Sequence, residues 1–301
     1  MSARPHVLIV NPSSGGGRGG KVLPEVEREL DHAHISYRTV VTRDLEHGVS
    51  EAVAAGEAGE IPVVMSGDGL IGQVGGALAR SDTPMGVIPG GRGNDFARVV
   101  GIPSEPAAAV AVLAAGNERQ IDVGEVNGER FLCIASMGFD SEANRLANDA
   151  KLIKGNLVYA YAALRALAAW RPATFTVVLD GDERVRNEGY AVAVANSRAF
   201  GGGMMIAPNA ELDDGLFDVI LTGRVSKFRF LANLPKVFKG THINEEEVRE
   251  IHAAASQIEV TASRRFAVYA DGEHLTDLPA KLRVLPRALR VIAPARAEGG
   301  A

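Results

Sequence analysis

Cysteine is nearly absent from this sequence, since Cys133 is the only one among 301 residues. A lone cysteine forms no disulfide within the chain, which is typical of proteins in a reducing compartment such as the cytoplasm. Cys133 lies inside the apolar run FLCIA (131–135). We therefore expect a buried core side chain at this position and not a reactive thiol.

Long apolar runs and an excess of positive charge are also missing. The opening stretch MSARPHVLIV has too short an apolar region for a signal peptide, and no run of about 18 uncharged apolar residues follows it. We therefore expect a soluble, cytoplasmic protein that contacts a membrane peripherally, at its inner face, if at all. The formal net charge of −5 argues against a nucleic-acid partner, because proteins that bind nucleic acids usually carry a basic field.

The first 122 residues alternate between strand-like apolar runs and helix-like segments. The strand-like runs are HVLIV (6–10), YRTVV (37–41), IPVVM (61–65) and MGVIP (85–89), and the helical segments are 21–33, 48–56, 70–80 and 106–116. This alternation is typical of parallel strands joined by helical crossovers. We predict a three-layer α/β domain over residues 1–122, with ligands at the carboxyl ends of its strands.

After residue 122 the pattern changes to alternating and β-branched runs such as ATFTVVLDG (173–181) and YAVAVAN (190–196). These runs predict a second, antiparallel β-rich domain over residues 123–286, with helical insertions at 156–170 and 226–240. The final apolar run, LRVIA (289–293), fits either domain by periodicity alone.

Glycine or small polar residues follow each strand of the first domain. The segments are NPSSGGGRGG (11–20), Thr42, SGDGLIGQ (66–73) and GGRGNDFAR (90–98). At one edge of a parallel sheet these loops converge, and their backbone N–H groups form an anion site. The first loop matches two phosphate-binding patterns by chance. A Rossmann loop needs glycine directly after the strand, and a Walker loop needs a hydroxyl where Val22 stands.

Asp68 lies between Gly67 and Gly69, directly after a buried strand and before a helix. Flanking glycines allow the backbone to approach a phosphate, and the carboxylate is suited to holding Mg²⁺ or orienting a hydroxyl group. The alternative is an ordinary Asp-Gly turn.

Five motifs in order now resemble one family. The segments NPSSGGG, SGDGL, GGRGNDFAR, IDVGEVNG and ADGE are similar to motifs of the bacterial lipid kinases of the diacylglycerol and sphingosine kinase superfamily. The resemblance implies an ATP-binding α/β domain (1–122) and a β-sandwich domain (123–286), with the nucleotide between them and residues from about 287 to 301 returning to the first domain. It also implies transfer of the γ-phosphoryl group of ATP, with Mg²⁺, to a lipid hydroxyl, with diacylglycerol as the preferred acceptor.

The resemblance further implies a set of nucleotide-binding positions. These are Asn11, Pro12, Gly15, Thr42, Ser66, Gly67, Asp68, Gly69, Leu70, Ile71, Arg92, Asn94, Asp95 and Asp122. Leu70 and Arg92 stand where the family usually has threonine, and Gln73 where glutamate is common. A guanidinium at Arg92 could bind phosphate directly and so replace the threonine hydroxyl that Leu70 does not supply. The alternative is that Arg92 is a solvated loop residue. Asp95 and Asp122 have structural alternatives as a helix cap or as part of a domain hinge, and Asp95 is the better placed to cap.

The segment ADGEHL (270–275) supplies a second pair of acids. We expect Asp271 and Glu273 to share one face of an extended segment, where paired carboxylates raise a pKa as a general base requires. The resemblance implies that Glu273 accepts the hydroxyl proton, with Asp271 beside it and Asp68 across the cleft. A hairpin turn is the alternative explanation for Asp-Gly.

A third acidic cluster is ELDDGLFDV (211–219). In the branch that the chain resembles, this segment binds a structural Mg²⁺, which implies as ligands the carboxylate of Asp214 and the main-chain oxygens of Glu211 and Leu216. Oxygen ligands in a tight turn suit such a hard cation. A solvated turn before a strand is the alternative.

Residues 224–239 combine five cations with aromatic and aliphatic side chains and contain no acid. Such a segment suits the surface of an anionic membrane, although an amphipathic helix packed on its own domain has the same pattern. In the same way, the helix predicted at 156–170 either lines an acyl pocket or packs in the core. Two other functions stay open: an NAD kinase, and a nucleotide-binding regulator with weak catalysis. The acceptor lipid and the oligomeric state, a homodimer included, are not decided by the sequence.

Overall fold

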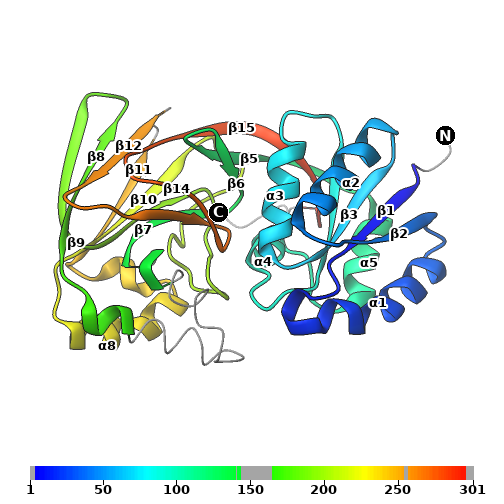
Figure 1. Cartoon of the computed structure of the whole chain (residues 1–301), viewed down its shortest axis with the longest axis horizontal. Coiled ribbons are helices and arrows are strands. Elements are labelled where there is room, and N and C mark those ends of the chain that lie inside the picture. The colour runs from blue at the N-terminus through cyan, green and yellow to red at the C-terminus, as the bar shows by residue number, and fades with distance from the viewer. Residues whose placement is uncertain (1–3, 140, 144–164, 254–256, 296–301) are drawn as a thin grey trace. The chain divides into compact units, whose positions relative to one another are not determined.

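The computed structural model describes residues 4–139, 141–143, 165–253 and 257–295 (Figure 1). The chain forms two compact units. Unit 1 comprises Met1–Val123, Gly201–Gly203 and Pro286–Ala301, and unit 2 comprises Gly124–Phe200 and Met204–Leu285. Unit 1 is therefore assembled from three separate stretches of sequence.

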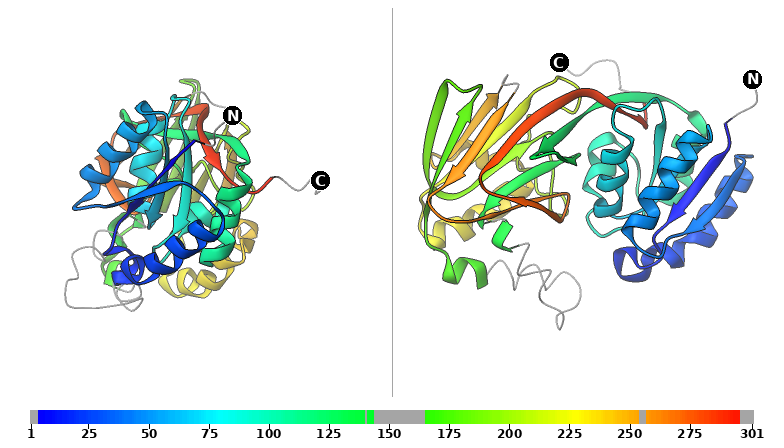
Figure 2. Two further views of the ribbon diagram at one scale, coloured as in Figure 1. Left: turned by 90° about the vertical axis from the view of Figure 1, so that its right-hand side faces the viewer. Right: turned by 45° about the horizontal axis from the view of Figure 1, so that its top comes forward.

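Unit 1 is built on a parallel sheet in the order β2-β1-β3-β4-β15. Its strands are β1 (His6–Val10), β2 (Tyr37–Val41), β3 (Ile61–Ser66), β4 (Pro84–Pro89) and the last part of β15 (Ala280–Ile292). Helices α1 (Ser14–His32) and α5 (Pro106–Ala115) contact each other, as do α2 (Leu45–Glu57) and α3 (Asp68–Leu78) (Figure 2). The sheet thus lies between two helical layers, as the sequence predicts.

The side-chain alternation of the strands supplies both layers of the core. Leu8 and Val10 pack with Val26 and Leu30 of α1, in a cluster that also holds Val110 of α5. The residues between them, such as Ile9, are equally buried but point to the opposite side of the sheet. Burial on both faces explains why these strands read as continuous apolar runs.

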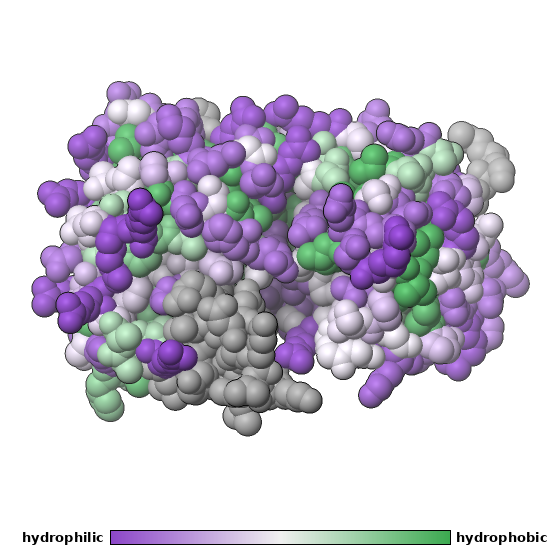
Figure 3. Space-filling model, in the orientation of Figure 1, coloured by the Kyte–Doolittle hydropathy of each residue, from purple (hydrophilic) through white to green (hydrophobic). Residues whose placement is uncertain are grey.

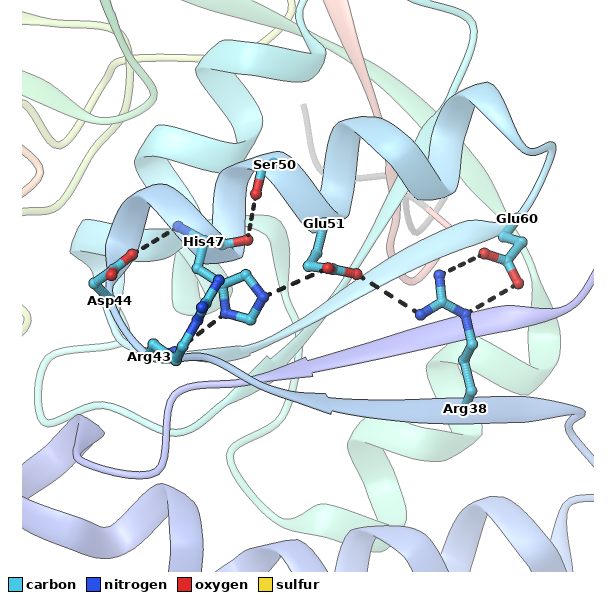
Figure 4. Close-up of polar contacts among 7 residues, drawn as sticks. All are labelled: Arg38, Arg43, Asp44, His47, Ser50, Glu51 and Glu60. Carbon is cyan, nitrogen blue, oxygen red and sulfur yellow. Dashed lines mark hydrogen bonds and ion pairs between the residues drawn. The ribbon is translucent and has the colours of Figure 1, made fainter.

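A polar network fixes the start of α2 (Figure 4). The Asp44 carboxylate accepts the N–H of His47 at 2.7 Å and so caps the helix. The His47 ring contacts Glu51 at 3.4 Å, and Arg38 of β2 pairs with Glu60 at 2.8 Å. Each such exposed pair contributes at most about 1 kcal/mol. Arg38 also lies 3.7 Å from Glu51, so the network connects α2 to β2.

Unit 2 is an antiparallel β-sandwich. Its strands are β5 (Glu118–Val126), which begins in unit 1, β6 (Glu129–Phe131), β7 (Ile134–Gly138), β8 (Ala173–Leu179), β9 (Glu183–Ala195), β10 (Phe217–Gly223), β11 (Val248–Ala253), β12 (Ile258–Ala262), β13 (Ala267–Ala270), β14 (Glu273–Asp277) and the first part of β15. Two hairpins turn on Asn127-Gly128 and Asp271-Gly272, with left-handed φ angles of 50° and 95°, and 52° and 89°. Asn, Asp and Gly favour this geometry, so the dipeptides determine these turns.

The core of unit 2 is aromatic. Trp170, Tyr190 and Phe266 are all at most 7 % exposed, and Phe139 contacts both Trp170 and Tyr190. Helix α8 (Lys227–Phe238) joins this cluster through Phe230, whose ring stacks on Tyr190 with centroids 4.5 Å apart. A short 3₁₀ helix, η1 (Thr241–Asn244), follows α8.

Several predictions about the fold are confirmed. The architecture is α/β followed by a β-sandwich, Cys133 is 2 % exposed, and the helix predicted at 226–240 is α8. Of the helix predicted at 156–170, residues 165–169 are helical and 156–164 lie outside the described residues. Among the described residues, no helix combines the length and the apolar character that crossing a bilayer requires.

Candidate active site

The carboxyl ends of four strands in unit 1 are held together by backbone hydrogen bonds. The N–H of Asn11 donates to Met65 O at 3.1 Å, that of Thr42 to Val10 O at 2.8 Å, and that of Gly90 to Ser66 O at 2.8 Å. The chain leaves β1 toward β2 on one side and crosses to β3 on the other. This reversal of strand order at a sheet edge is where α/β proteins bind their ligands.

The loop after β1 contains three consecutive left-handed glycines, Gly15, Gly16 and Gly17, with φ of 60°, 73° and 91°. A Cβ on Gly15 would lie 2.7 Å from Gly90 O, so glycine allows this loop to touch the loop after β4. The Ser14 hydroxyl donates to the same carbonyl at 3.1 Å. Asn11 stabilises the start of the loop, because its Oδ1 accepts the N–H of Ser13. Pro12, which lies between them, is exposed.

The loops after β3 and β4 also touch through glycine. A Cβ on Gly91 would lie 2.5 Å from the Cα of Gly67, closer than any real contact of this kind. Asn94, with φ of 51°, accepts the N–H of Gly91 on its Oδ1 at 2.8 Å and so fixes the turn. The predicted phosphate loops therefore form one continuous backbone surface in unit 1.

Asp68 stands at the centre of this surface. Its carboxylate accepts the backbone N–H of Phe96 at 3.1 Å, in the first turn of α4 (Asp95–Val100). Burial raises the pKa of Asp68 first and the neighbouring charge of Asp95 raises it further, while hydrogen bonds from the first residues of α4 oppose both effects. Asp95 has this effect because two neighbouring carboxylates disfavour being ionised at the same time.

Asp95 does not cap α4, so this structural alternative from the sequence is wrong. Its two carboxylate oxygens accept the N–H groups of Gly202 and Gly203, each at 2.7 Å. The helix start is satisfied by Asp68 instead. A Cβ on Gly93 would lie 2.9 Å from Asp68 Oδ2 and 3.1 Å from Asp95 Oδ2, so the two acids flank this glycine.

The segment Gly201–Gly203 belongs to unit 1 but was not among the predicted site residues. All three glycines have left-handed φ angles, of 67°, 86° and 96°. The triplet GGG was the available signal, because three adjacent glycines in a folded region often mark a backbone that must approach another closely. Periodicity gave no reason to connect it with Asp95.

Two residues of the predicted nucleotide set are core side chains. Leu70 is 2 % exposed, and a Cβ on Gly48 of α2 would lie 2.8 Å from its Cδ1. Ile71 is fully buried. Their side chains therefore pack inside unit 1, and a phosphate would meet only backbone N–H groups at the start of α3. Thr42, Ser66 and Gly69 lie at the same edge, after β2 or at the junction of β3 with α3.

Arg92 is exposed in the loop after β4 and reaches toward the loop after β1. A Cβ on Gly16 would lie 3.1 Å from its Nη2 atom. The guanidinium therefore lies beside the left-handed glycines.

Asp122 has a different environment. It is fully buried and its Oδ1 accepts the N–H of Arg287 at 2.6 Å, which connects β5 to β15.

In unit 2, Asp271 and Glu273 do not share one face of an extended segment. Asp271 occupies the first turn position between β13 and β14, with φ of 52°. Its carboxylate accepts the N–H groups of Leu132 at 2.7 Å and Cys133 at 2.9 Å. The hairpin alternative is correct, and the described contacts of Asp271 anchor the turn. Burial alone raises the pKa of Glu273, with no contribution from a neighbouring acid.

The segment 211–216 forms a turn before β10. The Asp214 Oδ1 accepts the N–H of Leu216 at 2.9 Å, and Glu211 lies 3.8 Å from the guanidinium of Arg198. Within the described part of the chain, no three His, Cys, Asp or Glu side chains are grouped as metal ligands. One carboxylate with carbonyl oxygens is a donor set of another kind, and it suits Mg²⁺ or Ca²⁺.

Two family models match the chain. The diacylglycerol kinase catalytic domain matches residues 5–126, and the YegS C-terminal NAD kinase beta sandwich-like domain matches residues 133–293. Among curated relatives, a diacylglycerol kinase of Mycobacterium tuberculosis (strain ATCC 25618 / H37Rv) is 34 % identical, over 95 % of this chain and 94 % of the relative. One of Bacillus subtilis (strain 168) is 30 % identical, over 95 % of each. A probable YegS-like lipid kinase of Pseudomonas aeruginosa (strain PAO1) is 33 % identical, over 96 % and 94 %.

Solved structures share the fold. A putative diacylglycerol kinase from Bacillus anthracis str. Sterne superposes with a TM-score of 0.80 at 22 % identity, over 98 % of both chains. An NAD kinase from Archaeoglobus fulgidus in complex with ATP has a TM-score of 0.52 at 14 % identity, over 96 % of this chain and 93 % of the other. These identities establish a common fold and carry no information on substrate.

Proposed function

We propose that this chain, which belongs to the diacylglycerol kinase family of ATP-dependent lipid kinases, uses diacylglycerol as its acceptor. In this reaction an oxygen of the lipid hydroxyl attacks the γ-phosphorus of ATP. The bond from that phosphorus to the bridging oxygen breaks, ADP leaves, and the hydroxyl proton passes to a base.

One observation in unit 1 supports this function most directly. Asp68, with a pKa raised by burial and by Asp95, lies where the glycine loops after β1, β3 and β4 touch. Backbone N–H groups and helix N-termini bind phosphate oxygens, while a carboxylate by itself repels them. A carboxylate inside a phosphate-binding surface is therefore suited to holding a cation that accompanies the phosphates.

The residues at this edge suit Mg²⁺ accompanying ATP. We assign the ion to Asp68, with Asp95 adding negative charge that the Gly202 and Gly203 N–H groups keep in place. When bound, Mg²⁺ would neutralise charge on the phosphates during transfer. Arg92 would bind phosphate from the side of the β1 loop, which compensates for the apolar Leu70.

We assign the general base to Glu273 of unit 2. Burial raises its pKa, and a base with a pKa closer to neutrality is better matched to accepting an alcohol proton. Asp271 would act through its neighbours, because its carboxylate holds the N–H groups of Leu132 and Cys133. It would fix the hairpin that carries Glu273.

We also keep the segment 211–216 as a proposed second Mg²⁺ site. Asp214 already orders this turn through the Leu216 N–H, so the backbone is shaped before an ion arrives. Bound Mg²⁺ would raise the melting temperature of the chain without ATP, and Asp214→Ala would abolish that increase.

Contact with the membrane would occur through the outer face of α8. Phe228, Leu231 and Phe238 are 83 %, 38 % and 54 % exposed, and their spacing of three and seven residues places them on one side of the helix. The cationic character of this segment is weaker than its sequence indicates. Arg229 pairs with Glu247 at 2.9 Å and Lys236 with Glu245 at 2.6 Å.

The acceptor is tested with purified full-length protein, γ-labelled ATP and three substrates in parallel. These are vesicles containing diacylglycerol, vesicles containing sphingosine, and NAD in solution. We expect label in the diacylglycerol arm, with loss of at least about a hundredfold in Asp68→Asn. Label in the sphingosine arm alone would identify sphingosine and not diacylglycerol as the acceptor. Label on NAD alone would reject a lipid acceptor.

A further inference from the structure

Unit 2 contains a cavity of about 530 Å³, and the described residues that line it include none that we assign to the kinase site. Its walls come from the described residues Glu142, Arg165, Ala166, Ala169, Trp170, Arg264, Arg265, Phe266, Ala267 and Asp277. This volume lies in the range of roughly 300 to 1,000 Å³ that is typical of small-molecule sites. The floor is apolar and aromatic, while the rim carries charged groups.

Among the described residues that line the cavity, positive charges predominate. Arg165, Arg264 and Arg265 contribute three guanidinium groups. Of the two acids, Asp277 is 72 % exposed and already contacts His274 at 3.1 Å. Glu142 is therefore the main counter-charge near the floor. An anion entering the cavity gains from this imbalance.

Arg264 is held in a fixed position for such an anion. Its guanidinium carbon lies 4.8 Å from the ring centroid of Trp170 and 4.5 Å from that of Phe266. Its Nη2 donates to Arg171 O at 2.7 Å. Cation–π contacts and one hydrogen bond fix the orientation of the group but use only part of its donor capacity, because a guanidinium has five N–H donors.

The environment of Arg264 also leaves its charge incompletely compensated. Burial lowers the pKa of this guanidinium first, the positive charge of Arg171 lowers it as well, and Glu142 opposes both effects. A guanidinium whose charged form is disfavoured by its surroundings is stabilised when an anion binds to it. A cation held in place at an aromatic floor therefore favours an anionic ligand.

We propose that the cavity beside Trp170 binds a phosphate monoester. A phosphate monoester carries close to two negative charges at neutral pH, and its oxygens match the planar N–H forks of arginine. A carboxylate carries only one negative charge, so repulsion by the nearby Glu142 cancels a larger share of its attraction to the arginines. The apolar floor of Trp170, Phe266 and three alanines accepts the carbon skeleton of the ester. Such a ligand is either a phosphorylated lipid or a small soluble phosphate ester.

Trp170 is the only tryptophan in the chain, so its emission reports directly on this cavity. We would titrate the full-length protein, without ATP or acceptor, with glycerol 3-phosphate, short-chain phosphatidic acid below its critical micelle concentration, short-chain phosphatidylcholine, and hexanoate. We expect a saturable change with one or both phosphate monoesters and none with phosphatidylcholine or hexanoate. A response to phosphatidic acid alone assigns a lipid ligand, and a response to both assigns the phosphate group itself.

Variants locate the binding to these arginines. Arg264→Gln and Arg165→Gln should each raise the apparent Kd about tenfold or more, whereas Arg249→Gln, an exposed change in β11, should leave it unaltered. Arg165→Gln keeps the test decisive if Arg264→Gln destabilises the fold. No saturable change in any arm, an equal response to hexanoate, or unaltered Kd in both arginine variants would each reject the site. Because the readout needs neither ATP nor turnover, failure here is separate from failure of the proposed kinase reaction.

Discussion

The carboxylate of Asp68 caps a helix that begins 27 residues further along the chain, by accepting the N–H of Phe96 at 3.1 Å. The same carboxylate lies beside Gly93 and feels the charge of Asp95. A residue proposed to hold the metal of the reaction is thus also part of the structure that shapes the loop after β4. Substitutions at this position need to separate the two roles.

Asp68→Asn separates them, because the amide oxygen still accepts the Phe96 N–H while the negative charge is lost. We expect turnover to fall about a hundredfold or more, the scale typical of lost electrostatic stabilisation. The melting temperature should not fall at neutral pH, since a buried carboxylate with a raised pKa disfavours the folded state there. Asp82→Asn, whose side chain is 96 % exposed, is the control for both assays. Full activity in Asp68→Asn would remove this residue from the metal site.

Glu273→Gln should give opposite results in activity and in stability. Because burial raises the pKa of Glu273, turnover of the wild type should increase with pH through that raised value, and the variant should lose at least about a hundredfold in turnover. Below the ordinary pKa of 4.5, protonated Glu273 makes its full favourable contribution to the free energy of unfolding. This contribution is lost as the pH rises through the raised pKa of Glu273 in the folded state. At neutral pH the variant should therefore melt higher than the wild type. A pH–rate profile and calorimetry measure the two effects, and an unchanged acid limb in the variant would contradict the assignment.

Asp271→Asn tests the anchor of the hairpin. Asparagine tolerates the left-handed φ of 52°, so only the hydrogen bonding changes. The carboxylate of Asp271 has two acceptor oxygens, and each accepts one N–H group, from Leu132 or from Cys133. The amide of asparagine has only one acceptor oxygen, so one of these N–H groups would lose its partner. We expect a loss of about 1–3 kcal/mol in the free energy of unfolding, the usual effect of one buried group without a partner. Asp277→Asn on the exposed end of β14 should have little effect, and equal denaturation midpoints for the two variants would disprove the anchoring role.

Gly91→Ala examines the contact between the loops after β3 and β4. The new methyl group would lie 2.5 Å from the Cα of Gly67, so one of the loops must move. We expect ATP affinity to fall by about tenfold or more, as judged by equilibrium binding. Gly116→Ala at the end of α5 places its methyl group in open space with φ of 63°, so it adds backbone strain of about 1–2 kcal/mol without touching the loops. Retained affinity in Gly91→Ala would mean that these loops do not form the nucleotide surface.

Phe228→Ser addresses the outer face of α8. Transferring one phenylalanine into a membrane contributes roughly 1.5–3 kcal/mol, so vesicle binding measured by sedimentation should weaken about tenfold or more. Turnover on a short-chain lipid below its critical micelle concentration should stay the same, because Phe228 is 83 % exposed. Val41→Ser, at a residue 52 % exposed in unit 1, is the matched apolar-to-polar control. Equal vesicle binding by the two variants would place membrane contact elsewhere.

Local patterns predicted the fold well. The strands of unit 1 read as apolar runs because both faces of the sheet are buried. The loops of the candidate site were also found, because glycine directly after a buried strand is a local signal. In these cases the property that shapes the backbone lies within a few residues of sequence.

The contacts of single acids were not predictable in the same way. Asp95 bonds to Gly202 and Gly203, more than 100 residues away, and Asp271 bonds to Leu132 and Cys133. A carboxylate has the same appearance in sequence whether it caps its own helix or holds a distant backbone. The helix-cap alternative for Asp95 considered only its nearest helix for that reason. Asp271 was placed beside Glu273 because an extended segment was assumed where the chain turns.

The path of β15 has a consequence for synthesis. Arg290 and Val291 pair with Pro84 and Met85 of β4, so one side of β4 has no strand neighbour until those residues have left the ribosome. All of unit 2 emerges before them. The unit that carries the glycine loops is therefore begun first and completed last, and a nascent chain that stops short of β15 would expose an unpaired strand edge, the kind of edge on which chains aggregate.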